Sequence, residues 1–425
     1  METENIKKIA VIGLGYVGLP LAVEFGKQYE TIGYDINIER INGLNEGIDT
    51  TAEIESFDFE KAKHLKFTDK LNDLSSCNIF IAAIPTPIDI HNSPDLTLLR
   101  SACKSIASIL KVGDTVIFES TVYPGTTDDI CRVILEKESG LKVNSDFYLG
   151  YSPERINPGD KENRITDIVK VTSGSSESAA QFIDKLYSSI ISAGTYRASS
   201  IKVAEAAKII ENTQRDVNIA LMNELSIIFS KIGIDTQEVL EAAKTKWNFI
   251  SYTPGLVGGH CIGVDPYYLA YKSLEVGHNP KLIIAGRELN DSMGEYVANL
   301  FVERMNKKGI KLTGSNVLIM GVTFKENTPD IRNSRAFDIA DQLEKYSIHV
   351  DMYDPLADKD EVYEEYSREM IDDPKTEYYD GVIIVIPHEE FVSEGINRIK
   401  SLIKVENVVF DVKSIFDKSE SDIRL

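Results

Sequence analysis

The glycine-rich segment from Gly255 to Asp265 contains the residues of this sequence that are best suited to covalent chemistry. It places a thiol, Cys261, between glycines and next to His260, and a carboxylate, Asp265, follows four residues later. A thiolate can hold a carbonyl carbon covalently, and a nearby carboxylate can act as a general base toward water. A lone cysteine is more often structural than catalytic. The glycine-rich surroundings favour the catalytic interpretation here.

A second glycine motif lies near the N-terminus, at Gly13, Gly15 and Gly18. It follows an apolar run and opens a helical pattern, as in the G-x-G-x-x-G turn that holds a pyrophosphate at a helix N-terminus. Asp35 follows 22 positions after Gly13, where such folds place the acid that binds a ribose 2′-hydroxyl. This carboxylate would repel a 2′-phosphate, so we predict NAD rather than NADP, although Arg40 is a nearby cation. Glycines that only build a turn are the alternative.

A proline-free stretch after residue 200 carries further polar side chains. Lys208, Asn212 and Arg215 fall at i, i+4 and i+7, and Glu205 lies one turn earlier, so they share one helix face. A solvated face with ordinary ion pairs is the alternative. The stretch is also rich in apolar residues, and a lysine and an asparagine on a largely buried helix need partners such as a substrate oxyanion. With a hydride acceptor and a thiol, these groups predict an oxidation that continues past the aldehyde.

Size and composition limit the class of protein. A chain of 425 residues is too long for one compact core, so we expect two or three domains. The net charge of −21 argues against a nucleic acid or an anionic membrane as the main partner. No apolar run reaches the roughly 18–20 residues that span a bilayer, and no apolar secretion segment precedes the first strand, so we expect a cytoplasmic protein.

The cysteines and histidines give no sign of a metal site. The four cysteines are scattered without paired spacing, and we expect them to be reduced thiols. Cys77 is expected to begin a buried strand, and Cys103 and Cys131 to lie in helices, where packing is their simplest role. With only six histidines in the chain, we predict no bound metal.

Apolar runs that alternate with helical patterns predict an α/β fold with parallel strands covered on both faces. In the first part, the expected strands are 8–12, 31–35, 78–84, 115–118 and 147–151. In the last part, they are 316–321, 349–353, 381–386 and 407–411. Between them, residues 201–232 read as one helix about 45 Å long, which suits a connector and a subunit interface.

The fold class is therefore α/β, with two Rossmann-like doubly wound domains joined by a long central helix and a helical dimerisation region. We place an NAD-binding domain at residues 1–195, the central helical region at 196–305 and a second α/β domain at 306–425.

Seven motifs give the sequence a strong resemblance to the UDP-glucose/GDP-mannose dehydrogenase family over essentially its whole length. They are GLGYVGLP at 13–20, PTP at 85–87, ESTVYPGTT at 119–127, YSPERINPG at 151–159, AEAAKIIENTQR at 204–215, GGHCIGVDP at 258–266 and TFKENTPDIRNSR at 323–335. Their length and order make the resemblance specific.

The resemblance implies a fold and a reaction. The family has an N-terminal NAD domain, a central dimerisation region and a C-terminal domain that holds a nucleotide-sugar diphosphate. It oxidises a sugar 6-hydroxymethyl group to a carboxylate with two NAD per turnover. By this resemblance, Cys261 traps the C6 aldehyde as a thiohemiacetal, a second hydride transfer gives a thioester, and water cleaves it.

The resemblance also implies site residues. The expected catalytic residues are Cys261, Lys208, Asn212, Asp265, Glu154 and Thr121. The expected NAD-binding residues are Gly13, Gly15, Tyr16, Val17, Gly18, Asp35, Arg40, Thr86, Thr121 and Arg332. The expected substrate-binding residues are Glu154, Arg155, Lys208, Asn212, Arg215, Tyr252, Gly255, Gly258, Phe324 and Lys325.

One departure from the family pattern bears on the substrate. Glucose- and mannose-type members commonly carry a second glutamate four residues after the position of Glu154, where this sequence has Pro158. PER-x-x-PG is typical of the branch that acts on UDP-N-acetylhexosamines, and the sequence most resembles the UDP-N-acetylglucosamine 6-dehydrogenases of Vi-antigen and O-antigen pathways. In this branch Arg155 replaces an apolar residue, and we expect it to contact the substrate.

We therefore expect a homodimeric UDP-N-acetylglucosamine 6-dehydrogenase that supplies an acidic sugar nucleotide for surface polysaccharide. The same chemistry on UDP-N-acetylgalactosamine, UDP-N-acetylmannosamine or UDP-glucose is one alternative. A non-catalytic nucleotide-binding regulator and a two-electron hydroxyacid dehydrogenase are others.

Overall fold

The computed structural model describes residues 8–51, 53–156, 164–259 and 262–425. The chain divides into two compact units, each of which is described by itself. Unit 1 comprises Met1–Glu211 and Tyr267–His278, and unit 2 comprises Asn212–Pro266 and Asn279–Leu425. The domain boundaries near residues 195 and 305 stay predictions.

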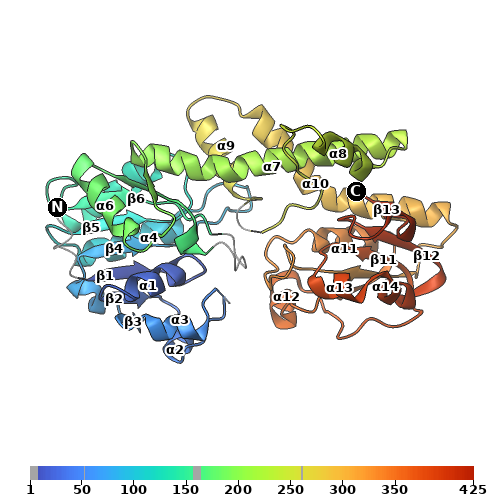
Figure 1. Cartoon of the computed structure of the whole chain (residues 1–425), viewed down its shortest axis with the longest axis horizontal. Helices are drawn as coiled ribbons and strands as arrows, with labels where there is room; N and C mark the ends of the chain where they lie inside the picture. Colours follow the sequence, from blue (N-terminus) through green and yellow to red (C-terminus); the bar gives the residue numbers. More distant parts are fainter. Residues whose placement is uncertain (1–7, 52, 157–163, 260–261) are drawn as a thin grey trace. The chain divides into compact units, whose positions relative to one another are not determined.

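Unit 1 is built on one sheet, whose eight strands among the described residues have the order β3-β2-β1-β4-β5-β6-β7-β8. The strands are β1 (Ile9–Ile12), β2 (Thr31–Tyr34), β3 (Leu65–Thr68), β4 (Ile79–Ala82), β5 (Thr115–Phe118), β6 (Tyr148–Tyr151), β7 (Lys170–Gly174) and β8 (Thr195–Arg197). The helices are α1 (Gly18–Gly26), α2 (Ile38–Asn45), α3 (Ser56–Lys61), α4 (Thr97–Ile109), α5 (Arg132–Ser139) and α6 (Glu177–Ser188), together with α9 (Asp265–Glu275), which starts in unit 2 (Figure 1).

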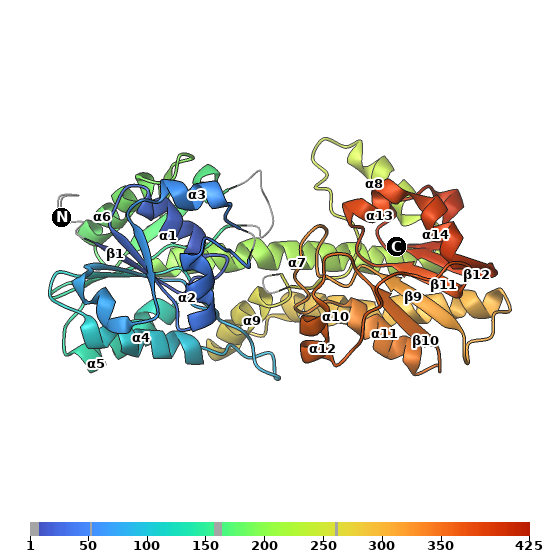
Figure 2. The same cartoon turned by 90° about the horizontal axis from the view of Figure 1, so that it is seen from below.

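The central strands of this sheet are continuous apolar runs, as parallel strands covered on both faces require. Every residue of β1, β4 and β5 is buried. Helices α1 and α6 cover one face of the sheet, and α4 and α5 cover the other (Figure 2). Strands β2 and β4 pair with opposite edges of β1, so the sheet has a topological switch point at the carboxyl end of β1. The predicted α/β class is confirmed.

Some elements of unit 1 differ from the expectation. The sequence indicated neither β3 nor β7, and β7 pairs with β6 in the antiparallel direction. Strand β4 begins at Ile79, so Cys77 precedes the strand and does not begin it. Strand β2 ends at Tyr34, so Asp35 is the first residue after it. Register and strand ends depend on neighbouring strands, which short apolar runs do not reveal.

The predicted long helix is present as α7 (Ile201–Ile232), which has 32 residues. Its first residues belong to unit 1 and the rest to unit 2. Neither α7 nor any other helix in the described part of the chain is both long and apolar enough to cross a membrane.

Unit 2 contains a second parallel sheet, whose five strands among the described residues have the order β10-β9-β11-β12-β13. The strands are β9 (Asn316–Met320), β10 (His349–Tyr353), β11 (Tyr379–Ile384), β12 (Ile403–Asp411) and β13 (Ile423–Arg424). The helices are α8 (Thr236–Lys244), α10 (Lys281–Lys307), α11 (Ala336–Glu344), α12 (Lys359–Tyr366), α13 (Glu389–Glu394) and α14 (Ile396–Leu402), with the greater part of α7.

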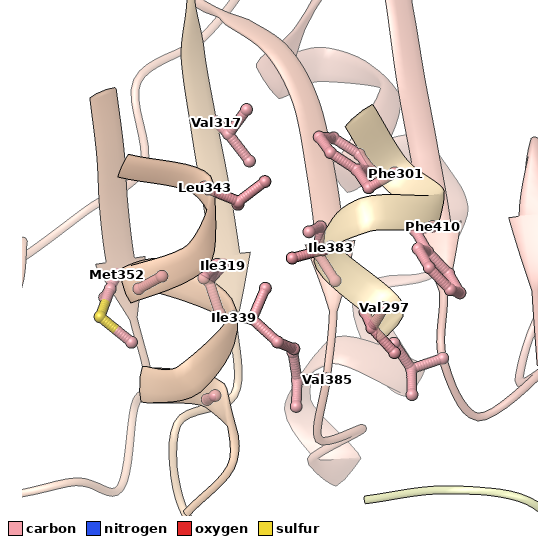
Figure 3. Close-up of a cluster of buried hydrophobic side chains, with 14 of the residues drawn as sticks. Val297, Phe301, Val317, Ile319, Ile339, Leu343, Met352, Ile383, Val385 and Phe410 are labelled. Carbon is pink, nitrogen blue, oxygen red and sulfur yellow. The ribbon is translucent and has the colours of Figure 1, made fainter. Parts of the chain in front are cut away.

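The core of unit 2 forms where α10 and α11 pack on one face of this sheet (Figure 3). The Phe301 ring of α10 lies so close to β11 that a Cβ at Gly381 would be 2.4 Å from its Cζ atom. The glycine therefore lets the helix approach the sheet. Apolar side chains of α10, α11, β9 and β11 fill the space between the helices and the sheet, among them Val297, Phe301, Ile319, Ile339, Leu343 and Ile383.

Candidate functional site

The loop after β1 has the geometry of a dinucleotide-binding turn. Gly13 has a φ of +88°, and its N–H donates to the Tyr34 carbonyl at 2.9 Å. A Cβ at Gly18 would lie 1.8 Å from the Gly13 carbonyl oxygen, so the first turn of α1 packs directly on the loop. A Cβ at Gly15, in contrast, would meet nothing within 4 Å. The space beside Gly15 is open to a ligand that needs close approach to backbone N–H groups.

Asp35 and Arg40 hold this loop from the carboxyl end of β2 and from α2. Oδ2 of Asp35 accepts the Leu14 N–H at 2.8 Å, and Nε of Arg40 donates to the Leu14 carbonyl at 3.0 Å. The Arg40 guanidinium also lies 2.8 Å from Asp49, whose pKa is held below its usual value because hydrogen bonds from Thr51 and Arg40 outweigh its burial. Arg40 is thus tied to protein groups, and the role of Asp35 toward a ribose stays a prediction.

The carboxyl ends of β4 and β5 meet beside this loop. Oγ1 of Thr86 donates to the Thr121 carbonyl at 2.6 Å, and the hydroxyl of Tyr268 lies 2.9 Å from the Thr86 carbonyl. Two predicted NAD-binding residues that are 35 positions apart are therefore in direct contact. Tyr16 and Val17 complete the glycine loop, and both are half-buried.

Glu154 and Lys208 form a buried pair in unit 1. Nζ of Lys208 is 3.3 Å from Oε2 of Glu154, and the two side chains are 5% and 4% exposed. Oε1 of Glu154 is buried and has no hydrogen-bond partner among the described residues. A buried carboxylate oxygen without a donor costs about 1–3 kcal/mol, so it is a natural place for a substrate hydroxyl or a water molecule.

Arg155 is held by two contacts within the protein. Its guanidinium donates to Oε1 of Glu211 at 2.7 Å and to the Val169 carbonyl at 2.7 Å. The Arg155 side chain remains 29% exposed, so part of it is accessible from outside the protein. Its contact with the substrate stays a prediction.

Sequence reasoning missed a buried charged cluster next to Glu154. Nζ of Lys170 donates to the Pro153 carbonyl at 2.7 Å and also to Glu119, which in turn accepts a hydrogen bond from the Tyr187 hydroxyl. The Lys170 and Glu119 side chains are 4% and 0% exposed. Burial raises the pKa of Glu119, and the Lys170 ammonium opposes that rise. No sequence signal pointed to the cluster, because the residues of the strand that carries Lys170 read as a loop. The Lys170 contact with the Pro153 carbonyl holds the backbone next to Glu154.

Glu205 holds the loop after β5 from helix α7. Its two carboxylate oxygens accept the Gly125 N–H at 2.6 Å and the Thr127 N–H at 2.8 Å. Burial raises the pKa of Glu205 to about 7, while the hydrogen bonds from Gly125 and Thr127 lower it. The sequence placed Glu205 on the face of Lys208, and its partners are backbone groups of the segment that follows Thr121.

In unit 2, Asn212 and Asp265 are brought together. Nδ2 of Asn212 donates to Oδ2 of Asp265 at 2.5 Å, and both side chains are buried. Because the amide orients the acid, Asp265 presents a fixed carboxylate at the start of α9. Cys261, four residues earlier, and His260 lie outside the described residues, as does Pro158.

The segment before Cys261 is held through its backbone groups, to which the Asn223 side chain is hydrogen-bonded. Oδ1 of Asn223 accepts the Gly255 N–H at 2.8 Å, and its Nδ2 donates to the Gly255 carbonyl at 3.0 Å. A Cβ at Gly258 would lie 2.7 Å from the Asn333 carbonyl oxygen and 3.1 Å from Cβ of Phe324. Unit 2 thus brings three predicted substrate-binding residues, Gly255, Gly258 and Phe324, into one region.

The remaining predicted residues of unit 2 are less confined. Arg332 pairs with Asp330 at 2.5 Å, Lys325 and Tyr252 are half-buried, and Arg215 is exposed. Arg335, which was not predicted, donates to the Val257 carbonyl at 3.2 Å and so supports the same segment. The roles assigned to these residues stay predictions.

The other three cysteines are packing residues. Cys77, Cys103 and Cys131 are all buried and carry no disulfide. Burial raises the pKa of Cys77 to about 11, and the pKa of Cys131 is raised well above its usual value by its contact with Cys103 and by burial. Neither is activated as a nucleophile.

The switch point, the glycine turn and the open space at Gly15 together are the features of a dinucleotide-binding fold. Comparison with known proteins then shows which family it is. Three family models match: the NAD-binding domain at residues 7–191, the central domain at 202–292 and the UDP-binding domain at 318–418 of the UDP-glucose/GDP-mannose dehydrogenases. The chain belongs to this family. It is an NAD-dependent nucleotide-sugar dehydrogenase.

Individual relatives agree with this result. A UDP-N-acetyl-D-glucosamine 6-dehydrogenase from Pseudomonas aeruginosa is 55% identical, covering 98% of this chain and 99% of the relative. One of the same name from Salmonella typhi is 52% identical, covering 98% of each. Among solved structures, a UDP-D-ManNAc dehydrogenase from Pyrococcus horikoshii superposes with a TM-score of 0.88 at 32% identity and covers 98% of both chains.

Substituting Gly15 by alanine should separate cofactor binding from folding. Because a Cβ at Gly15 meets no protein atom, we expect G15A to fold like the wild type, with the Kd for NAD raised about tenfold or more, which corresponds to about 1.4 kcal/mol. Calorimetric titration with NAD and thermal unfolding would measure the two effects. G18A is the contrasting variant, because its Cβ would collide with Gly13 and lower the stability itself. Equal NAD affinity in G15A and wild type would contradict the assignment.

Substituting Glu205 by glutamine should change how stability depends on pH. With a pKa of about 7 in the folded chain and about 4.5 when unfolded, Glu205 keeps its proton longer in the native state. Between these values the native state binds more protons, so the unfolding free energy falls as the pH rises. Relative to E205Q, the wild type should lose about 3 kcal/mol between pH 4.5 and pH 7.

Denaturant titrations of the wild type and E205Q at several pH values would test this. Glu224 lies exposed on the same helix, so E224Q is a matched control that should track the wild type. A pH-independent difference between the wild type and E205Q would show that Glu205 is ionised throughout this range.

Proposed function

We propose that the chain oxidises the C6 hydroxymethyl group of UDP-N-acetylglucosamine to a carboxylate. The observation that carries the chemistry is the buried Glu154–Lys208 pair, in which one carboxylate oxygen has no donor among the described residues. The substrate is inferred from the relatives named UDP-N-acetyl-D-glucosamine 6-dehydrogenase at 55% and 52% identity.

The open glycine turn and Asp35 fit NAD, which supplies the hydride acceptor when bound. Glu154 accepts a substrate hydroxyl or a water through its open oxygen. Lys208 is a fixed ammonium that stabilises the oxygen at C6 as negative charge develops, an effect worth a few kcal/mol for each well-placed donor. Asn212, one turn further along α7, adds an amide donor and orients Asp265.

Cys261 makes the second oxidation possible. Its thiolate adds to the C6 aldehyde, and the resulting thiohemiacetal still carries a C–H bond from which a second hydride can leave. The product is a thioester, and a water activated by Asp265 cleaves it to the carboxylate and the free thiol. One sugar and one water thus consume two NAD and release two NADH and three protons.

A panel of nucleotide sugars tests the substrate. The protein should reduce NAD with UDP-N-acetylglucosamine and give two NADH for each sugar converted. Preferential turnover of UDP-N-acetylgalactosamine, UDP-N-acetylmannosamine or UDP-glucose would leave the chemistry in place and change the substrate. One NADH for each sugar would favour a two-electron dehydrogenase, and no turnover of any sugar would favour a non-catalytic regulator.

Substituting Cys261 by serine tests the covalent step. A serine alkoxide is far less accessible than a thiolate near neutral pH, so carboxylate formation should fall below detection while the Kd for NAD stays within about twofold of the wild type. C103A is the matched control, because Cys103 is fully buried and has no part in the proposed reaction, and it should form the carboxylate normally. Carboxylate formation by C261S at the wild-type rate would exclude the thioester route.

We also propose a homodimer formed through the central helix. In unit 2, α7 leaves Leu221, Ile228 and Ile232 exposed at helical spacing, by 49%, 46% and 62%. A partner helix would bury this row of apolar side chains.

The proposal places the reaction in the cytoplasm, where the thiols stay reduced, and assigns its product to surface polysaccharide synthesis.

A further inference from the structure

His388 is a buried histidine that the proposed chemistry does not use. It precedes α13 in unit 2 and is 1% exposed. Its Nε2 lies 2.9 Å from Oδ2 of Asp354 and 3.2 Å from Oγ1 of Thr323. Its Nδ1 accepts the Asn327 N–H at 3.0 Å. Both ring nitrogens are therefore engaged by the segment between β9 and α11, and by the residue that follows β10.

These contacts determine the protonation of the ring. Because Nδ1 accepts a backbone N–H, it carries no proton, so the proton is on Nε2, which donates to Asp354. His388 is thus a neutral ring whose Nε2 donates to Asp354 and whose Nδ1 accepts from Asn327.

Asp354 uses its carboxylate entirely within the protein. Oδ2 accepts the Val322 N–H at 2.7 Å and the Thr323 N–H at 3.1 Å, in addition to His388. Oδ1 accepts the Leu356 N–H at 2.8 Å. Burial would raise the pKa of Asp354, but the hydrogen bond from His388 and those from the backbone hold the pKa below its usual value. The group is an ionised anchor for the start of the loop after β9.

The same position in unit 1 is occupied by Asp35, and the comparison shows a change of role. Each acid directly follows the second strand of its sheet and accepts an N–H from the loop after the first strand, Leu14 in one case and Val322 in the other. Asp35 is half-buried and can face a ribose, whereas Asp354 is 4% exposed and saturated. In unit 2 the acid serves the loop rather than a ligand.

The far end of the loop is fixed at Asn327. This residue has a φ of +56°, a left-handed conformation that asparagine tolerates. Its N–H donates to His388, and its Oδ1 accepts the Glu389 N–H at 2.9 Å. Between the two anchors, Oγ1 of Thr323 donates to the Lys325 carbonyl at 3.0 Å. Phe324 and Lys325 therefore lie on a short segment that is held at both ends.

We propose that His388 and Asp354 are positioning residues that hold Phe324 and Lys325 in the conformation that binds the nucleotide sugar. The inference rests on the proposed role of Phe324 and Lys325 in substrate binding. It assigns no contact between His388 and the substrate. Its consequence is that loss of the His388 contacts with Asp354 and Asn327 raises the KM for the sugar nucleotide and leaves the KM for NAD unchanged.

Two substitutions separate the two functions of the ring. Asparagine at position 388 places an amide oxygen near the position of Nδ1, so H388N can still accept the Asn327 N–H while losing Asp354. Glutamine reaches the position of Nε2, so H388Q can still donate to Asp354 while leaving the Asn327 N–H without its acceptor. We expect H388Q to raise the KM for UDP-N-acetylglucosamine about tenfold and H388N to raise it less, because only H388Q frees the Asn327 end.

The measurements are steady-state KM values for both substrates, calorimetric titration with UDP alone, and thermal unfolding of every variant. H349Q is the matched control, because His349 is exposed at the start of β10, and it should behave as the wild type. F324A is the reference for loss of a direct contact. If the His388 variants do not fold, D354N is the second variant, since it replaces the carboxylate oxygen that accepts from His388 and from the loop after β9, and it should raise the sugar KM.

The outcomes distinguish the positioning role of His388 from the substrate-binding role of Phe324. An unchanged sugar KM in H388Q, or in D354N where that is the variant tested, together with an increase in F324A would overturn the positioning role and leave the proposed function intact. No effect in F324A either would remove Phe324 from the substrate site. An equal rise in the KM for NAD and for the sugar would show a general structural defect, which also overturns the inference.

Discussion

Both units of this protein depend on buried or half-buried carboxylates that accept backbone N–H groups at the carboxyl ends of strands. Asp35 holds the loop after β1, Glu205 the loop after β5, and Asp354 the loop after β9. Each acid replaces water around N–H groups that a turn leaves unpaired, and such charge-assisted bonds are stronger than neutral ones. The conformations of these loops are therefore fixed by contacts within the protein.

This arrangement also explains how a chain with a net charge of −21 can bind two anionic ligands. The acids nearest the loops have close partners, which are backbone N–H groups in three cases and the Lys170 ammonium in the case of Glu119. Lys208 is set against Glu154 inside unit 1. The field that a ligand meets is set by these close partners, because exposed charges further than about 8–10 Å away are screened by salt.

The sequence predicted the parts of the fold in which local pattern and burial agree. Strands β1, β4, β5 and β9 are apolar runs, and helix α7 was predicted with its observed ends. Strand β7 was missed because its residues are Lys, Val, Thr, Ser and Gly, which read as a loop. These polar side chains can be buried because they have hydrogen-bond partners. Ser173 donates to the Tyr151 carbonyl, and Thr172 donates to Asp184.

For the site as well, the sequence predicts only what a local pattern encodes. The glycine turn and Asp35 could be predicted because a motif encodes them within a short stretch of sequence. The Glu119–Lys170–Tyr187 cluster could not, because its members are separated by 51 and 68 positions and come from β7, α6 and the end of β5. Removing one partner of such a buried pair leaves an uncompensated charge, which costs about 3–5 kcal/mol. That cost supplies a reason for the three residues to occur together, and Lys170, which Glu119 holds, donates to the Pro153 carbonyl next to Glu154.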